Sequence, residues 1–105
     1  MFLPLQITLR NVPHSEELDE VIRRRAEGLQ DLQQLTSCRV VVERVGHQGP
    51  LFAVRIDLKM AGSEIAVDHQ HNRDLRIAVR DAFDAARRQL EDRIRLRRGD
   101  VKAHT

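Results

Sequence analysis

The stretch FAVRIDLKM, residues 52–60, decides the fold, because its apolar and polar side chains alternate without a break. Phe52, Val54, Ile56, Leu58 and Met60 occupy every second position, and this period of two predicts a strand with one buried face and one solvated face. A sheet of this kind needs amphipathic helices over its apolar face. The neighbouring segments must therefore supply both the remaining strands and the helices that cover them.

Three more segments have the character of strands. Leu5, Ile7 and Leu9 alternate with polar residues, and residues 37–45 are rich in β-branched side chains. Residues 64–68 follow residues 52–60 across Gly62, and so short a connection predicts a hairpin. The sequence therefore predicts a four-stranded sheet.

Two segments have helical periodicity. The first covers residues 15–34, with Ser15 as N-cap and acidic residues in the first turn. The second begins near residues 72–74 and runs about 25 residues to Gly99, with apolar side chains at spacings of three and four.

The resulting order, β-α-β-β-β-α, predicts an α+β fold similar to double-stranded RNA-binding domains. We expect a mixed sheet of four strands, of which the first two are parallel and the rest antiparallel, with both helices packed on one face. The length of 105 residues suits a single domain over 1–105, and we expect 99–105 to form a flexible tail.

Positive charge is concentrated in the last third of the chain. Residues 1–70 carry 8 Lys and Arg against 10 Asp and Glu, whereas residues 71–105 carry 10 against 6. Such a local excess indicates a polyanionic partner. The chain has no Trp or Tyr and only three Phe, which argues against single-strand binding on an aromatic platform.

The arginines form two clusters. The second helix presents one stripe, with Arg88 beside it, and the first helix carries three consecutive arginines. The sequence leaves two interpretations open. The clusters form a solubilising surface, with Asp84 and Glu91 pairing with nearby arginines, or they form a ridge that recognises the spacing of phosphates. Arg25 falls near the apolar stripe, where its stem can cover the core edge or its head can hold a phosphate. The stripe consists of Arg73, Arg76, Arg80, Arg87, Arg95 and Arg98, and the other cluster of Arg23, Arg24 and Arg25.

No catalytic motif accompanies these clusters. Cys38 lies in a predicted strand and reads as a small apolar residue, and a single cysteine favours a reducing, cytoplasmic setting. His69 and His71 are two positions apart, but no further ligand stands at a spacing typical of metal sites. We therefore expect no enzyme activity, metal, cofactor or small-molecule substrate, and no membrane segment, since no apolar run approaches about 20 residues.

Four stretches together resemble the ribosome hibernation-promoting factor and ribosome-associated inhibitor family, also called sigma-factor modulation proteins. They are RVVVE at 39–43, VRIDL at 54–58, Gly62-x-Glu64-Ile65, and above all VRDAFDAARRQLED at 79–92. The resemblance covers nearly the whole chain. It implies binding to the small subunit of the bacterial ribosome, through ribosomal RNA near the decoding region, and a block of translation in stasis or stress. Carried over residue by residue, the RNA contacts would be Arg23, Arg24, Arg25, Arg76, Arg80, Arg87, Arg88 and Arg95.

A second hypothesis is a protein-interaction module. The same basic helix face, or the exposed face of the sheet, would then bind an acidic protein partner. Capture of a partner that nuclease treatment does not abolish would favour this alternative.

Overall fold

The computed structural model describes residues 3–46 and 48–97, and these residues adopt the predicted order of elements. The predicted tail at 99–105 and Arg98 lie outside the described residues. The elements are β1 (Leu5–Arg10), α1 (Glu16–Leu32), β2 (Ser37–Val45), β3 (Leu51–Met60), β4 (Ser63–Asn72) and α2 (Leu75–Arg97).

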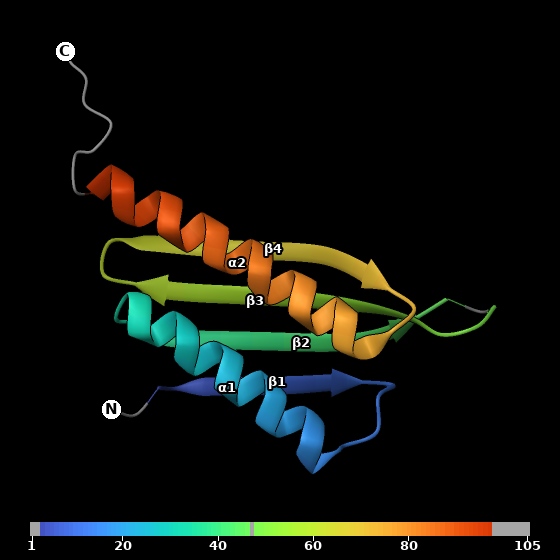
Figure 1. Cartoon of the computed structure of the whole chain (residues 1–105). Helices are drawn as coiled ribbons and strands as arrows, with labels where there is room; N and C mark the ends of the chain where they lie inside the picture. The colour runs from blue at the N-terminus through green and yellow to red at the C-terminus, as the bar shows by residue number, and fades with distance from the viewer. Residues whose placement is uncertain (1–2, 47, 98–105) are drawn as a thin grey trace.

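The strands form one mixed sheet in the order β1-β2-β3-β4, and both helices cover the same face of it (Figure 1). β1 pairs with β2 in parallel, whereas the β2–β3 and β3–β4 pairs are antiparallel. Figure 1 shows the helices side by side and running in the same direction, both away from the end of the sheet at which β1, β2 and β4 end. The predicted α+β fold is confirmed.

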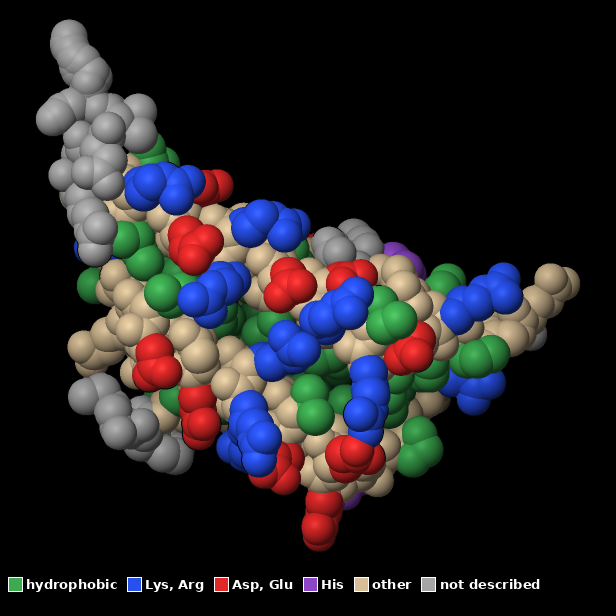
Figure 2. All heavy atoms as spheres, in the orientation of Figure 1, with side chains coloured by type: hydrophobic (Ala, Val, Ile, Leu, Met, Phe, Trp, Pro, Cys, Tyr) green, Lys and Arg blue, Asp and Glu red, His purple; other side chains and the backbone are tan. Residues whose placement is uncertain are grey.

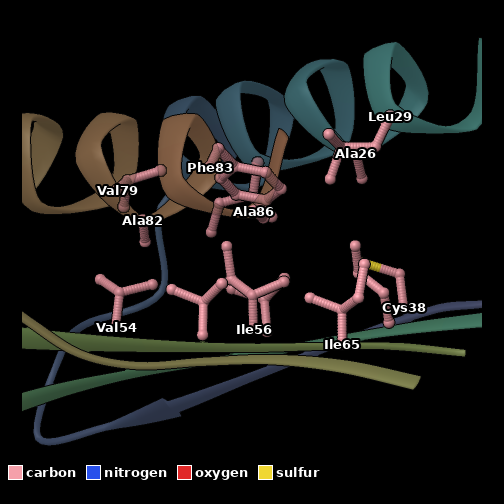
Figure 3. Packing of buried hydrophobic residues seen from close by; sticks show 14 of the residues in the cluster. Ala26, Leu29, Cys38, Val54, Ile56, Ile65, Val79, Ala82, Phe83 and Ala86 are labelled. Carbon is pink, nitrogen blue, oxygen red and sulfur yellow. The ribbon is translucent and has the colours of Figure 1, made fainter. Parts of the chain in front are cut away.

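The core lies between the sheet and the helices. Ile56 and Leu58 of β3 are fully buried, as are Ile22 of α1 and Leu90 of α2, so the period of two and the helical period turn their apolar residues into the same layer. Figure 3 shows Ala82 and its α2 neighbours directed at the apolar face of the sheet. Small alanine side chains let α2 approach the sheet closely, which holds the exposed side of that helix in a defined position.

Side chains cap both helices at their N-termini. The backbone N–H of Leu18 donates to Ser15 Oγ at 3.2 Å, which confirms Ser15 as the N-cap of α1. Asp74 does the same for α2, because its Oδ1 accepts from the N–H groups of Arg76 and Ile77 at 2.9 and 3.3 Å. Both helix starts are therefore encoded locally.

The predicted end of the first helix at residue 34 was two residues too late. Gln33 is already extended, with φ −156° and ψ 132°, and its N–H bonds to the carbonyl of Leu29. Leu35 is buried, and its N–H donates to Gln30 Oε1 at 2.8 Å. Packing of Leu35 into the core turns the chain away from the helix axis.

The predicted fourth strand was too short. Residues 69–72, which lie beyond the predicted strand at 64–68, continue β4, with His71 opposite Ala53 and Asn72 opposite Phe52. A register irregularity between Val54 and Ile56 places one extra residue on β4 at this point. Such a bulge breaks the alternation of side chains, so the strand continues where its sequence pattern ends.

Candidate nucleic-acid interface

Three arginines of α2 face α1. Arg76 forms an ion pair with Glu17, which crosses from one helix to the other. Arg80 and Arg87 follow Arg76 by 4 and 11 residues, spacings that return to within about 40° of the same side of a helix. All three side chains are exposed. They therefore line the side of α2 that borders α1.

One arginine of α1 meets them from the other side. Val21 lines a pocket together with Leu75 and Val79 of α2, and Arg25 follows Val21 by one helical turn. Arg25 is half-buried, and the described part of the chain offers it neither a hydrogen bond nor an ion pair. The prediction that it lies at the core edge is confirmed. We call Arg25, Arg76, Arg80 and Arg87 the arginine seam.

Arg88 and Arg95 lie on the outer surface of α2, opposite its buried residues. They are seven residues apart and therefore share one side of the helix. Both are exposed. Arg95 pairs with Asp92, whereas Arg88 has no carboxylate partner within 3–46 and 48–97. Arg88 is therefore available to an external anion without prior loss of an internal contact.

Arg23 and Arg24 do not join the seam. Arg23 follows Val21 by two residues and so points about 160° away from α2. It pairs with Asp19 at 2.8 Å, and Arg24 pairs with Glu20 at 2.9 Å while its side chain stays 75% exposed. The two clusters expected from the sequence therefore meet through Arg25 only.

Carboxylates are interleaved with the basic groups of the helix layer. Six of the eight predicted RNA contacts pair with an acidic side chain, and Figure 2 shows red side chains among the blue ones over both helices. α1 carries 3 arginines against 6 carboxylates, whereas α2 carries 7 against 4. The layer is thus balanced overall, and its positive charge lies on α2 and in the seam.

The ion pairs do not prevent anion binding. They are exposed, and pairs of this kind contribute only about 0–1 kcal/mol each. Glu91 pairs with Arg87 at 3.4 Å, as the sequence suggested, while Arg80 binds its neighbour Asp81 rather than Asp84. A phosphate can replace such a carboxylate at small cost, because Arg offers it a bidentate contact.

A pocket of about 270 Å³ lies at one end of the seam, between the first turns of α1 and α2. Its walls come from three separate stretches of the chain, residues 12–21, β3 and α2, and Phe52 and His14 contribute rings to it. Sequence reasoning missed this site, because Phe52 was interpreted only as part of the alternating strand. No local signal could have revealed it, since the pocket exists only where the segments pack together. The lining residues are Val12, Pro13, His14, Ser15, Glu17, Leu18, Val21, Phe52, Leu75, Arg76 and Val79.

The open face of the sheet differs from the helix layer. Its outward-facing charges alternate, and Arg55 bridges Asp57 at 3.2 Å and Asp68 at 3.6 Å. Among the residues that the structure describes, four basic and four acidic groups balance on this face, so they give it no net charge that would attract an acidic partner. These groups are Arg10, Arg39, Arg55, Lys59, Glu43, Asp57, Glu64 and Asp68.

Cys38 is fully buried, and loss of solvation, with a smaller contribution from the Asp57 carboxylate, raises the pKa of its thiol to about 12. A thiol of this kind remains protonated and is a poor nucleophile. Within the described ranges, no three His, Cys, Asp or Glu side chains gather as metal ligands would. In the same part of the chain, neither helix has the length and apolar character that a bilayer crossing requires.

Two solved structures share this fold. A ribosomal subunit interface protein from Coxiella burnetii superposes with a TM-score of 0.74 at 18% identity, over 86% of this chain and 96% of its own. The N-terminal domain of Protein Y from Thermus thermophilus gives a TM-score of 0.67 at 20% identity, over 88% of this chain and 98% of its own. A comparison with curated proteins gives no match.

The family comparison extends beyond the fold. The model described as sigma 54 modulation protein / S30EA ribosomal protein matches residues 5–98. This range begins with β1 and passes the end of α2, so it includes every element of the sheet and of the helix layer. The chain therefore belongs to the sigma 54 modulation protein / S30EA ribosomal protein family.

Proposed function

We propose that this protein binds the small subunit of the bacterial ribosome in the cytoplasm, through ribosomal RNA near the decoding region, and blocks translation in stasis or stress. It acts by occupying the site and catalyses no reaction. The observation that carries the proposal is the arginine seam on the helix layer of a member of this family, together with Arg88, which has no carboxylate partner among the described residues. Structural neighbours named for the ribosomal subunit interface and for Protein Y support it.

The physical basis is recognition of shape and phosphate spacing. The arginines stand on two packed helices, so their positions relative to one another are held by the core below. Such a surface suits a structured RNA, whose phosphates have regular separations and whose grooves hide most base edges. Guanidinium groups bind phosphates in a fixed geometry, which favours arginine over lysine on this face.

Sedimentation with purified small subunits tests the proposal. A variant with Arg80→Glu, Arg87→Glu and Arg88→Glu should lose most of its binding at low salt, because three contacts become repulsive. Wild-type protein should also slow translation of a messenger RNA in a reconstituted system, and the variant should not. Binding of the variant equal to that of wild type would refute the proposal.

A matched control reverses three charges on the opposite face. Arg10→Glu, Arg39→Glu and Lys59→Glu change the net charge by the same amount but lie on the open side of the sheet. This control should keep most of the ribosome binding of wild type. Equal loss in both variants would mean that net charge, rather than the helix layer, governs association.

Salt dependence gives a quantitative check. Each phosphate contact should contribute roughly 0.7–0.9 to the slope of the logarithm of affinity against the logarithm of salt concentration. Arg88→Ala should therefore reduce the slope by close to one contact. Retention of the bound partner after nuclease digestion would instead favour the alternative, a module that binds an acidic protein through the basic helix face.

A further inference from the structure

We propose that the pocket between the first turns of α1 and α2 receives one unstacked nucleobase of the bound RNA. The inference rests on the proposed function and deepens it. The pocket lies at the end of the arginine seam, and Arg76 belongs to both. An RNA strand whose phosphates follow the seam would therefore bring a nucleotide to the mouth of the pocket.

The size of the pocket suits a single ring system. Its volume of about 270 Å³ falls just below the roughly 300–1,000 Å³ of pockets that hold drug-sized molecules. Its apolar walls consist of the side chains of Leu18, Val21, Leu75 and Val79. These side chains form no hydrogen bonds with water, so water in the pocket is easily displaced by an apolar surface. A flat, weakly solvated group such as the face of a nucleobase therefore gains the most binding free energy from this pocket.

Its lining supplies the contacts that proteins use for unstacked bases. These bases stack on aromatic rings, on histidine or on the guanidinium plane of arginine, and they form hydrogen bonds along their edges. Phe52, His14 and Arg76 provide the three kinds of stacking surface. The chain has only three Phe and no Trp or Tyr, so the placement of Phe52 in this pocket is informative.

The charged pair at the mouth adds selectivity. Glu17 can accept from an exocyclic amino group, and Arg76 can donate to an adjacent ring nitrogen or carbonyl oxygen. Their side chains are 69% and 66% exposed, so separating them to admit a base loses only a weak contact. The pocket should therefore favour bases that carry an amino group, namely adenine, cytosine or guanine, over uracil.

Filling the pocket tests the inference. Val21→Phe places a ring in it, and Val41→Phe makes the same change on the open face of the sheet as a control. Removal of the stacking contact of one base should lower the affinity for small subunits about 5- to 150-fold. We expect this loss for Val21→Phe and wild-type binding for Val41→Phe. Leu75→Trp serves as a second pocket-filling variant, and thermal unfolding establishes that each variant is folded.

Chemical footprinting identifies the occupant. Dimethyl sulfate modifies the base-pairing edges of adenine and cytosine and N7 of guanine, so wild-type protein should protect at least one such base that Val21→Phe leaves exposed. Unchanged binding and unchanged protection in Val21→Phe and Leu75→Trp would overturn the inference. Loss of binding without any base-specific protection would also overturn it, because the pocket would then hold a protein side chain.

The two proposals fail separately. If the Arg80, Arg87 and Arg88 charge reversal abolishes binding while the pocket-filling variants bind normally, only the nucleobase inference is wrong. If the charge reversal leaves binding unchanged, the proposed function itself is wrong.

Discussion

Gly28→Ala should stabilise this protein. Gly28 lies inside α1, outside the left-handed region of the backbone, and a Cβ added there would meet no heavy atom within 4 Å. Glycine in a helix interior costs about 0.8–1.0 kcal/mol relative to alanine, mainly through the entropy of the unfolded chain. For a domain of this size, about 1 kcal/mol corresponds to a rise of roughly 4–8 °C in Tm.

Gly62→Ala is the matched control, because the chemical change is the same. Gly62 joins β3 to β4, and a Cβ there would also meet no heavy atom within 4 Å, but its φ is +75°. The left-handed backbone is unfavourable by roughly 1–2 kcal/mol for a residue with a Cβ. This variant should therefore lose stability where Gly28→Ala gains it.

Thermal and urea unfolding, followed by circular dichroism, measure both effects. Ribosome binding by Gly28→Ala should equal that of wild type, since none of the eight candidate arginines changes. The reasoning would be refuted if the two substitutions shifted Tm in the same direction. A fall in Tm for Gly28→Ala would show that the helix has no room for a methyl group at this position.

Three further predictions concern the core, the thiol and the ion pairs. Leu90→Ala should lower the free energy of unfolding in urea by about 2–5 kcal/mol, because Leu90 is fully buried. Leu96 is 57% exposed, so Leu96→Ala should change the free energy of unfolding by no more than about 0.5 kcal/mol. Equal losses of stability in the two variants would contradict the packing described. As pH rises from 9 towards about 12, the free energy of unfolding should fall, because the Cys38 thiol ionises in the unfolded chain but stays protonated in the folded protein. Cys38→Ala should make the free energy of unfolding less dependent on pH in this range. If the variant keeps the full pH dependence of wild type, another group causes the effect. Glu91→Gln removes the carboxylate that pairs with Arg87 of the seam, and it should raise ribosome affinity by up to about fivefold in salt titrations. Glu27→Gln, on the outer side of α1, is the control and should raise the affinity less. A larger increase for Glu27→Gln than for Glu91→Gln would argue against the seam as the binding surface.

Local patterns were enough to predict most of the fold. Alternation in residues 52–60 identified β3, and Ser15 marked the start of α1 through its own side chain. Helical spacing placed Arg76, Arg80 and Arg87 on one side of α2, because a residue's side of a helix depends only on its position along the chain. Arg73, which the sequence assigned to the same stripe, precedes α2, because the helix begins at Leu75 after its cap, Asp74. The exposure of Arg80, Arg87 and Arg88 was predictable for the same reason.

Tertiary structure decided the rest. β4 continues past Val67 and the bulge because β3 provides further backbone hydrogen-bond partners. The residues that follow Val67 have no sequence pattern that predicts this continuation. Arg25 lies at the seam while Arg23 points away from it, because the packing of the two helices decides which side of α1 borders α2.

The sequence by itself determined the elements, the class of fold and the family resemblance, because backbone preferences and amphipathic periodicity depend on residues that are close together in the chain. Only the tertiary structure decided which arginines meet, which carboxylates pair with them, and that Phe52 and His14 line one pocket. These features depend on contacts between residues far apart in the chain. Such contacts are set by the packing of the whole core, which no single stretch contains.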